Sequence, residues 1–370
     1  MKMHFPNNTE HIPKIINNAD KLRDGMPIGI VLSLVFLSLF SLMVVGAEAK
    51  SSADSFSSAV PTKNIPQVTM MYDDKVYPMS TFVLANGGEM NKITIPIANP
   101  PEDGSNPPLH VQLGDTVHFQ FDREPTKVSA YLIDMDAQPV ELYAQRQIGS
   151  NDFQIVGPEG ILNYEVHAFF ADGQYTSQYL LVNVTSGASP SVRNFNAEGE
   201  ETGYIALSDK QACNRADRLH TLQISAGSQN TNSSSPITLL DNNLQTAWMV
   251  KSTDVKSYVK STSSDSKDVG YASSASPWLQ LDLGAEKMVC NIGIAFPNGD
   301  KSINFFTVQT SADGEHFKNA GDAESYPLGA GGQLFTFPDM PDKARYVRIT
   351  DVGNIISDQT EIAELMAAGK

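Results

Sequence analysis

Cysteine and positive charge are both scarce in this chain. Of its 370 residues only two are cysteine, Cys213 and Cys290. That is too few for a fold held by several disulfides or for a four-cysteine zinc site. Lysine and arginine together number 26, against 42 aspartate and glutamate residues, so the formal net charge is −16. A surface this acidic repels phosphate backbones, which argues against nucleic acid as a partner.

The sequence also lacks the motifs of common active sites. It contains no Gly-x-Ser-x-Gly nucleophile motif, no phosphate-binding glycine loop and no His-Glu-x-x-His zinc motif. Paired carboxylates occur throughout so acidic a chain, and they therefore do not indicate a glycosidase. His110, His118 and His167 fall in one region, but their spacing does not require them to meet at a metal. We expect a protein that is not an enzyme.

One long apolar run lies near the N-terminus. Residues 28–46 contain no charged side chain, and the basic residues before them include Lys14, Lys21 and Arg23. Ala47-Glu48-Ala49 follows, a small-x-small pattern typical of signal-peptide cleavage. The run is also long enough to span a bilayer as an uncleaved anchor, the one way this chain would meet a membrane. We favour cleavage of residues 1–49. Both interpretations place the rest of the chain outside the cytoplasm, secreted or at the cell surface.

The middle of the chain is predicted to be a β-sandwich. A Ser-rich spacer at 50–61 is followed by short β-type runs between turn residues, which is typical of antiparallel sandwiches. The runs that predict strands are 68–72, 92–98, 109–113, 116–121, 127–133, 140–144, 152–156, 164–170 and 178–184. Residues 62–185 resemble the immunoglobulin-like modules of extracellular proteins, although the Cys and Trp markers of antibody domains are absent.

Residues 186–218 shift to Ser, Gly, Asn and charge, which predicts a linker. Cys213 lies near its end. In an exported protein Cys213 and Cys290 can pair, and the alternative is two buried thiols.

Five ordered segments mark the last part of the chain, 219–370. In the second of them, Leu279, Leu281 and Leu283 alternate with polar residues, the pattern of a half-buried strand. In the fourth, Val347 and Ile349 share one face, and Tyr346 and Arg348 share the other. The segments are LLDNNLQTAW (239–248), PWLQLDLG (277–284), FFTVQTSADGEHF (305–317), ARYVRIT (344–350) and EIAELMAAG (361–369).

In this order and spacing, the segments resemble the discoidin family, also called coagulation-factor type C domains, to which family 32 carbohydrate-binding modules belong. The similarity is greatest to modules attached to polysaccharide lyases. The resemblance implies an all-β chain whose C-terminal domain is a jelly-roll sandwich with the galactose-binding-like fold. It also implies ligand loops gathered at one end and a domain that binds without catalysing.

The resemblance further implies a structural calcium ion, since many relatives hold one near these loops. A sharp loop can direct a carboxylate, a carbonyl and a hydroxyl to one point, and Ca²⁺ takes six to eight such oxygens. Asn242 stands where the family usually has Gly, and Asn tolerates the left-handed conformation. The alternative is a calcium-free loop whose polar side chains satisfy backbone donors. The implied ligands are Asp241, Asn243, Thr246 and Glu364, with carbonyls near Thr238 and Ala363.

The carbohydrate-contacting residues are expected in two loops. One connects Trp248 to Trp278 and is longer than usual in the family; both tryptophans are expected in the core. This loop offers Tyr258 and Tyr271 as flat faces for a sugar ring, and lysines for acidic polysaccharides. The other loop carries Asn298 and Lys301.

The sequence thus favours an exported binding protein that attaches to glycans, including acidic ones. The alternative is an adhesion or structural protein of the cell envelope, whose type C domain binds other proteins.

Overall fold

The computed structural model of the chain describes residues 65–370, with gaps at 87, 95, 97–105, 187–192, 196–200, 205–212, 214–215, 228–234, 252–275, 328–330 and 358. Strands dominate these residues, which confirms the predicted all-β class. Their helical residues are the 3₁₀ turn η2 (Pro236–Leu240) and Cys213. None of them forms a helix long and apolar enough to cross a membrane. The apolar run at 28–46 and the spacer at 50–61 lie outside the described residues.

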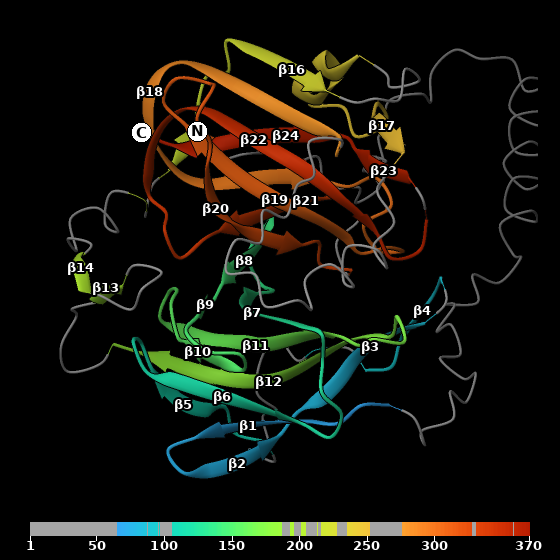
Figure 1. Cartoon of the computed structure of the whole chain (residues 1–370), viewed down its shortest axis with the longest axis vertical. Coiled ribbons are helices and arrows are strands. Elements are labelled where there is room, and N and C mark those ends of the chain that lie inside the picture. The colour runs from blue at the N-terminus through green and yellow to red at the C-terminus, as the bar shows by residue number, and fades with distance from the viewer. Residues whose placement is uncertain are drawn as a thin grey trace, which may run out of the picture. The chain divides into compact units, whose positions relative to one another are not determined.

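The first sandwich consists of two packed sheets (Figure 1). Its outer sheet has the strand order β2 (Lys75–Pro78), β1 (Val68–Tyr72), β6 (Thr116–Phe121), β10 (Asp152–Gln154) and β9 (Arg146–Gln147). Its inner sheet has the order β8 (Val140–Ala144), β7 (Lys127–Asp134), β11 (Gly160–Phe169), β12 (Tyr175–Thr185), β3 (Ser80–Asn86) and β4 (Glu89–Lys92), with β5 (Leu109–Gln112) parallel to the end of β12.

The inner sheet carries apolar side chains on both of its faces. Along β7, Ala130 and Leu132 belong to the core between the two sheets, whereas Tyr131 and Ile133 belong to a second core. Successive side chains of a strand point to opposite faces, so the inner sheet separates the two cores. The second core continues into the C-terminal sandwich, where Phe169 meets Phe305 edge-on at 4.9 Å between ring centroids.

The C-terminal sandwich is built around the long strand β18 (Trp278–Ala295). The first half of β18 pairs with β16 and β22, and its second half pairs with β21 and β24. One strand thereby pairs with four others. The partners and the strands beyond them are β15 (Asp217–Arg218), β16 (Gln223–Gly227), β19 (Asn304–Ser311), β20 (Lys318–Glu324), β21 (Gly332–Thr336), β22 (Asp342–Asn354) and β24 (Glu364–Gly369).

Two further strand pairs complete the described chain. β17 (Trp248–Lys251) pairs with β23 (Gln359–Ile362), next to the gap at 252–275. β13 (Arg193–Phe195) pairs with β14 (Glu201–Tyr204) within the predicted linker. The sheets of the two sandwiches also join, because β21 lies parallel to β8.

The alternating motifs fold as predicted. Leu279, Leu281 and Leu283 are buried, as are Val347 and Ile349. One predicted strand is wrong: of the described residues of the run 92–98, only Lys92 is in a strand, as the last residue of β4, and Ile93 is already outside a strand. In the first sandwich, β2, β3 and β9 fall in no predicted run. In β3, Phe82 to Ala85 are buried in succession. A strand covered on both faces loses the alternation on which the prediction relied.

Candidate functional site

A sharp loop after η2 gathers the oxygen ligands expected for calcium. Asn242 adopts φ +57°, the left-handed conformation that the sequence predicts for it in place of Gly. The Thr246 hydroxyl donates to Asp241 Oδ2 at 2.9 Å and to Asn243 O at 2.8 Å. Arg218 from β15 donates to the Asn242 amide oxygen at 2.6 Å and holds the tip of the loop.

Two carboxylates meet at this loop. The Asn243 N–H donates both to Asp241 Oδ1 and to Glu364 Oε1, each at 2.8 Å. Burial raises the pKa of Glu364 to about 7, and the nearby Asp241 charge adds to this, although the Asn243 N–H and Arg218 partly oppose it. Two carboxylates this close repel each other unless a proton or a cation lies between them. The donor set therefore fits a divalent cation.

The remaining implied ligands flank this pair. Thr238 O accepts the Asp241 N–H at 3.3 Å, and Ala363 precedes Glu364, with its N–H bonded to Ala295 O at 2.8 Å. Among the described residues no group of three or more His, Cys, Asp and Glu side chains could hold a metal. A cation at this loop would therefore depend on neutral oxygens besides its two carboxylates.

The loop between Phe296 and Ser302 presents both of its predicted ligand residues to solvent. Asn298 and Lys301 are exposed, and the Lys301 N–H bonds to Asn298 O at 3.0 Å. The Asn298 amide donates to Glu361 Oε2 on β23 at 3.0 Å. This loop therefore lies beside β23, whose partner β17 leads into the gap at 252–275. Tyr258 and Tyr271 fall in that gap, outside the described residues.

The two tryptophans at the ends of that gap differ in environment. Trp248 is 1% exposed and belongs to the core, as expected. Trp278 is half-buried instead, because it lies on the outer face of its sheet. There the guanidinium of Arg348 lies 4.6 Å from the ring centroid of Trp278 and 3.7 Å from that of Phe317. This Arg348 contact is a cation–π interaction within the sheet surface.

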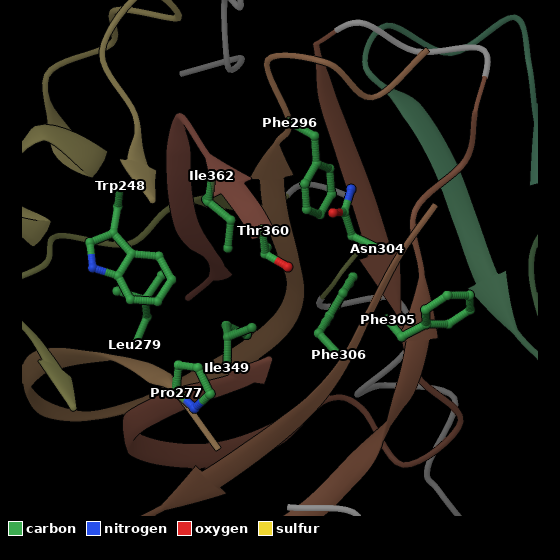
Figure 2. A pocket seen from close by; sticks show the side chains of 10 residues that line it. All are labelled: Trp248, Pro277, Leu279, Phe296, Asn304, Phe305, Phe306, Ile349, Thr360 and Ile362. Atoms are coloured by element: carbon green, nitrogen blue, oxygen red, sulfur yellow. The ribbon is translucent and has the colours of Figure 1, made fainter. Parts of the chain in front are cut away.

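A small cavity beside Trp248 is not a sugar site. Figure 2 shows Trp248 next to Leu279 on one side of it, with Phe296 and Phe306 across from them. Its volume is about 10 Å³, roughly the space for one water molecule. The indole Nε1 of Trp248 is buried and has no partner among the described residues. The cavity therefore belongs to the core.

A buried charged network joins the two sandwiches. His167 on β11 lies with Nδ1 at 2.5 Å from Glu324 Oε2 on β20, and with Nε2 at 3.3 Å from Glu165 Oε2. All three side chains are at most 1% exposed. The hydroxyls of Ser177 and Tyr326 donate to Glu165 at 2.8 and 2.9 Å, and that of Ser129 donates to Glu324 at 2.7 Å.

Both nitrogens of His167 thus face carboxylates, which requires a doubly protonated ring. Burial alone lowers the pKa of His167, but Glu324 and Glu165 outweigh it and raise this pKa to about 9. Sequence patterns gave no indication of this network, because its partners are 157 residues apart. The other two histidines of the region are elsewhere: His118 bonds to Asp152 at 2.8 Å, and His110 lies 3.4 Å from Asn183.

Cys213 and Cys290 form a disulfide in the structure, with their Cα atoms 5.6 Å apart. Cys290 lies in the second half of β18, so the bond fixes the end of the predicted linker to that strand.

The solved structures that are similar to this chain include modules and enzymes that act on or bind carbohydrates according to their descriptions, and each covers about 40% of this chain. The family 32 carbohydrate-binding module of AlyQ, solved with 4,5-unsaturated mannuronic acid, is 20% identical over 41% of this chain and 97% of the module, with a TM-score of 0.33. A pectin-binding carbohydrate-binding module is 19% identical over 40% of this chain and 91% of its own, with a TM-score of 0.32. The family 89 glycoside hydrolase of Clostridium perfringens is 22% identical over 40% of this chain and 14% of the enzyme, with a TM-score of 0.29.

No curated protein matches the chain significantly. The family model that matches is the F5/8 type C domain, over residues 223–365. This range contains η2, the long strand β18, the loop at Asp241 and the loop at Asn298. Residues 223–365 of this chain are therefore an F5/8 type C domain of the discoidin family.

Proposed function

We propose that this chain is an exported, non-catalytic binding protein that attaches to glycans through its F5/8 type C domain. The observation that carries the proposal is the family match together with the exposed loop that presents Asn298 and Lys301. An amide and an ammonium group suit the hydroxyls and carboxylates of an acidic polysaccharide. The solved modules named above include one with a uronic acid and one that binds pectin.

Export is supported by two independent features. The apolar run at 28–46 has the composition of a signal peptide or anchor. The disulfide between Cys213 and Cys290 is a bond that persists mainly in oxidising compartments outside the cytoplasm. We propose that the chain is secreted or held at the cell surface.

Calcium has a structural role in this proposal. Asp241 and Glu364 would supply the negative ligands, and Asn243 and Thr246 would supply neutral oxygens. The bound ion would neutralise two carboxylates that otherwise repel each other and would fix the loop after η2.

A glycan array tests the function. The full chain is applied to uronic-acid polysaccharides (alginate, polygalacturonate) and to neutral galactose-type glycans, once with 1–2 mM CaCl₂ and once with a chelator. We expect binding to at least one uronic-acid glycan, and weaker binding after chelation. No binding to any glycan in either buffer would contradict the proposal. Recovery of one specific envelope protein by the same chain would then favour the adhesion alternative.

The calcium site has its own test. Ligand that binds the folded state alone stabilises it by about 2.7 kcal/mol at one hundred times its Kd. We expect CaCl₂ to raise the melting temperature of the wild type, but not that of Asp241→Asn. Glu286→Gln, an exposed carboxylate on β18, serves as the matched control and should respond like the wild type. An equal rise in Asp241→Asn would place the ion elsewhere.

A further inference from the structure

The first sandwich contacts the loop between Phe296 and Ser302 of the F5/8 type C domain, which is called the ligand loop below. Lys92, the last residue of β4, donates from Nζ to the carbonyl oxygen of Asp300 at 2.5 Å. Asp300 lies in the same loop as Asn298 and Lys301. On the same hairpin, a methyl group added to Gly88 would lie 3.9 Å from Ile356 O, in the turn before β23. The β3–β4 hairpin (Ser80–Lys92) therefore contacts the type C domain at the loop of Asp300 and lies close to the turn before β23.

The Lys92 contact is partly shielded from solvent. Burial lowers the pKa of Lys92, while the Asp300 charge opposes that shift. Met90 of the same strand packs against the core that the two sandwiches share, and so does Ile355 in the turn before β23. Apolar packing thus adds to the hydrogen bond from Lys92 to Asp300 in holding the two segments together. This combination limits the positions that the loop can take.

The ligand loop is supported from two sides. On one side, Asn298 donates to Glu361 on β23, within the type C domain. On the other side, Lys92 donates to Asp300 from the first sandwich. Between these supports, the loop forms short turns of its own, with the Gly299 N–H on Phe296 O at 3.1 Å. Removing one support leaves the loop bound at one end only.

The two sandwiches are also held in register, which the hairpin contact requires. Besides the buried Glu165–His167–Glu324 network, Arg146 on β9 pairs with Asp339 at 2.9 Å. Lys127 at the start of β7 lies 3.8 Å from Asp322 on β20. These pairs lie on different strands, so they resist both sliding and rotation of one sandwich against the other.

We propose that the glycan site is composite: the β3–β4 hairpin forms one wall of it, and Lys92 is a positioning residue for the loop that carries Asn298 and Lys301. This proposal rests on the proposed function, because it assigns the first sandwich a part in the same site. The first sandwich is then more than a spacer, since ligand affinity depends on it.

Three variants of the full chain test this role. Lys92→Met keeps the apolar stem and removes the donor, and Lys92→Arg restores a cationic donor. Lys75→Met removes an exposed lysine of β2 whose nearest acidic partner, Asp73, is 3.9 Å away, and is the matched control. Hydrogen exchange is measured at the Gly299 and Lys301 amides, and affinity is measured for alginate and polygalacturonate trisaccharides.

We expect Lys92→Met to speed exchange at these two amides at least tenfold and to weaken trisaccharide binding at least fivefold. The melting temperature should stay within a few degrees of the wild type, and Lys92→Arg should recover most of both losses. Unchanged exchange in Lys92→Met would overturn the positioning role, whether or not a trisaccharide binds. Faster exchange with unchanged affinity would overturn the composite site. If no trisaccharide binds the wild type, the proposed function is contradicted, and the exchange measurement still decides whether Lys92 positions the loop.

Discussion

His167 makes more buried polar interactions than the sequence around it indicates. Its ring is closed between two carboxylates, and the rings of Tyr131 and Tyr175 lie 4.9 and 5.8 Å from it between centroids. A buried charge is tolerated when it is paired and hydrogen-bonded. Here a single imidazolium pairs with Glu165 on its own strand and with Glu324 on the other sandwich. Removing that charge leaves two carboxylates facing each other in a dry interface.

The stability of the chain should therefore depend on pH in a defined window. His167 has its pKa raised to about 9, from the ordinary value of about 6.5. Its contribution is fully present below pH 6.5 and is lost as the pH rises through 9. Burial raises the pKa of Glu324, but His167 reverses this, and the net pKa is below the usual value. The Glu324 contribution is lost only as the pH falls below about 4.5.

Urea denaturation across pH checks this expectation. The free energy of unfolding should be nearly constant between about pH 5 and pH 6.5, and then fall by about 3 kcal/mol by pH 9.5. In His167→Gln the alkaline decline should largely disappear, and stability at pH 6 should be lower by about 3–5 kcal/mol because a buried pair is broken. An identical alkaline decline in wild type and His167→Gln would assign the titration to another group.

Part of the candidate site could be predicted at the residue scale. The loop from Asp241 to Thr246 is local in sequence, and the resemblance to the discoidin family predicts both its converging oxygens and the left-handed Asn242, which has φ +57°. Lys92 and Asp300 are 208 residues apart, and no pattern in either segment indicates the other. Contacts of that kind depend on how two sandwiches meet, which is set by their complete surfaces.

At the scale of elements, a strand is easiest to predict from the sequence when only one of its faces is buried. β18 begins with one face toward the core and one toward polar groups, so its alternation is visible in the sequence. β11 and β12 are buried along almost their whole length, and they were located by their turns and apolar content, with shifted ends. β3 lacks an alternating pattern for a similar physical reason, since its residues Phe82 to Ala85 are buried in succession.

The disulfide links β18 covalently to the segment at Cys213. It closes a loop between residues 77 positions apart. In the chain-entropy account, a loop of that size stabilises the fold by about 4–5 kcal/mol. We expect Cys213→Ser, or reduction of the wild type, to lower the free energy of unfolding by a few kcal/mol in guanidinium titrations. A loss below 1 kcal/mol would show that β18 and the segment at Cys213 hold together without the bond.

At the scale of the whole molecule, the two sandwiches share one apolar core. Phe169, Tyr175 and Phe305 form a cluster of edge-on rings that includes both sandwiches. Shared cores of this kind couple the unfolding of their halves. Separate unfolding would expose this apolar surface and would break the pair between His167 and Glu324.

Calorimetry is therefore expected to show one unfolding transition for the whole folded part of the chain. Phe169→Ala, which removes a ring from the shared core and costs about 3–5 kcal/mol, should separate it into two. Two transitions already in the wild type would mean that the sandwiches unfold independently.

The most direct test of the central claim, that the exposed loop end of the F5/8 type C domain binds glycan, is a calorimetric titration with the strongest-binding uronic-acid oligosaccharide of the array. Asn298→Ala is compared with the wild type, and Gln223→Ala, an exposed amide on β16, is the control. We predict at least a tenfold loss of affinity in Asn298→Ala and wild-type affinity in Gln223→Ala. Equal affinity in all three proteins would contradict the claim.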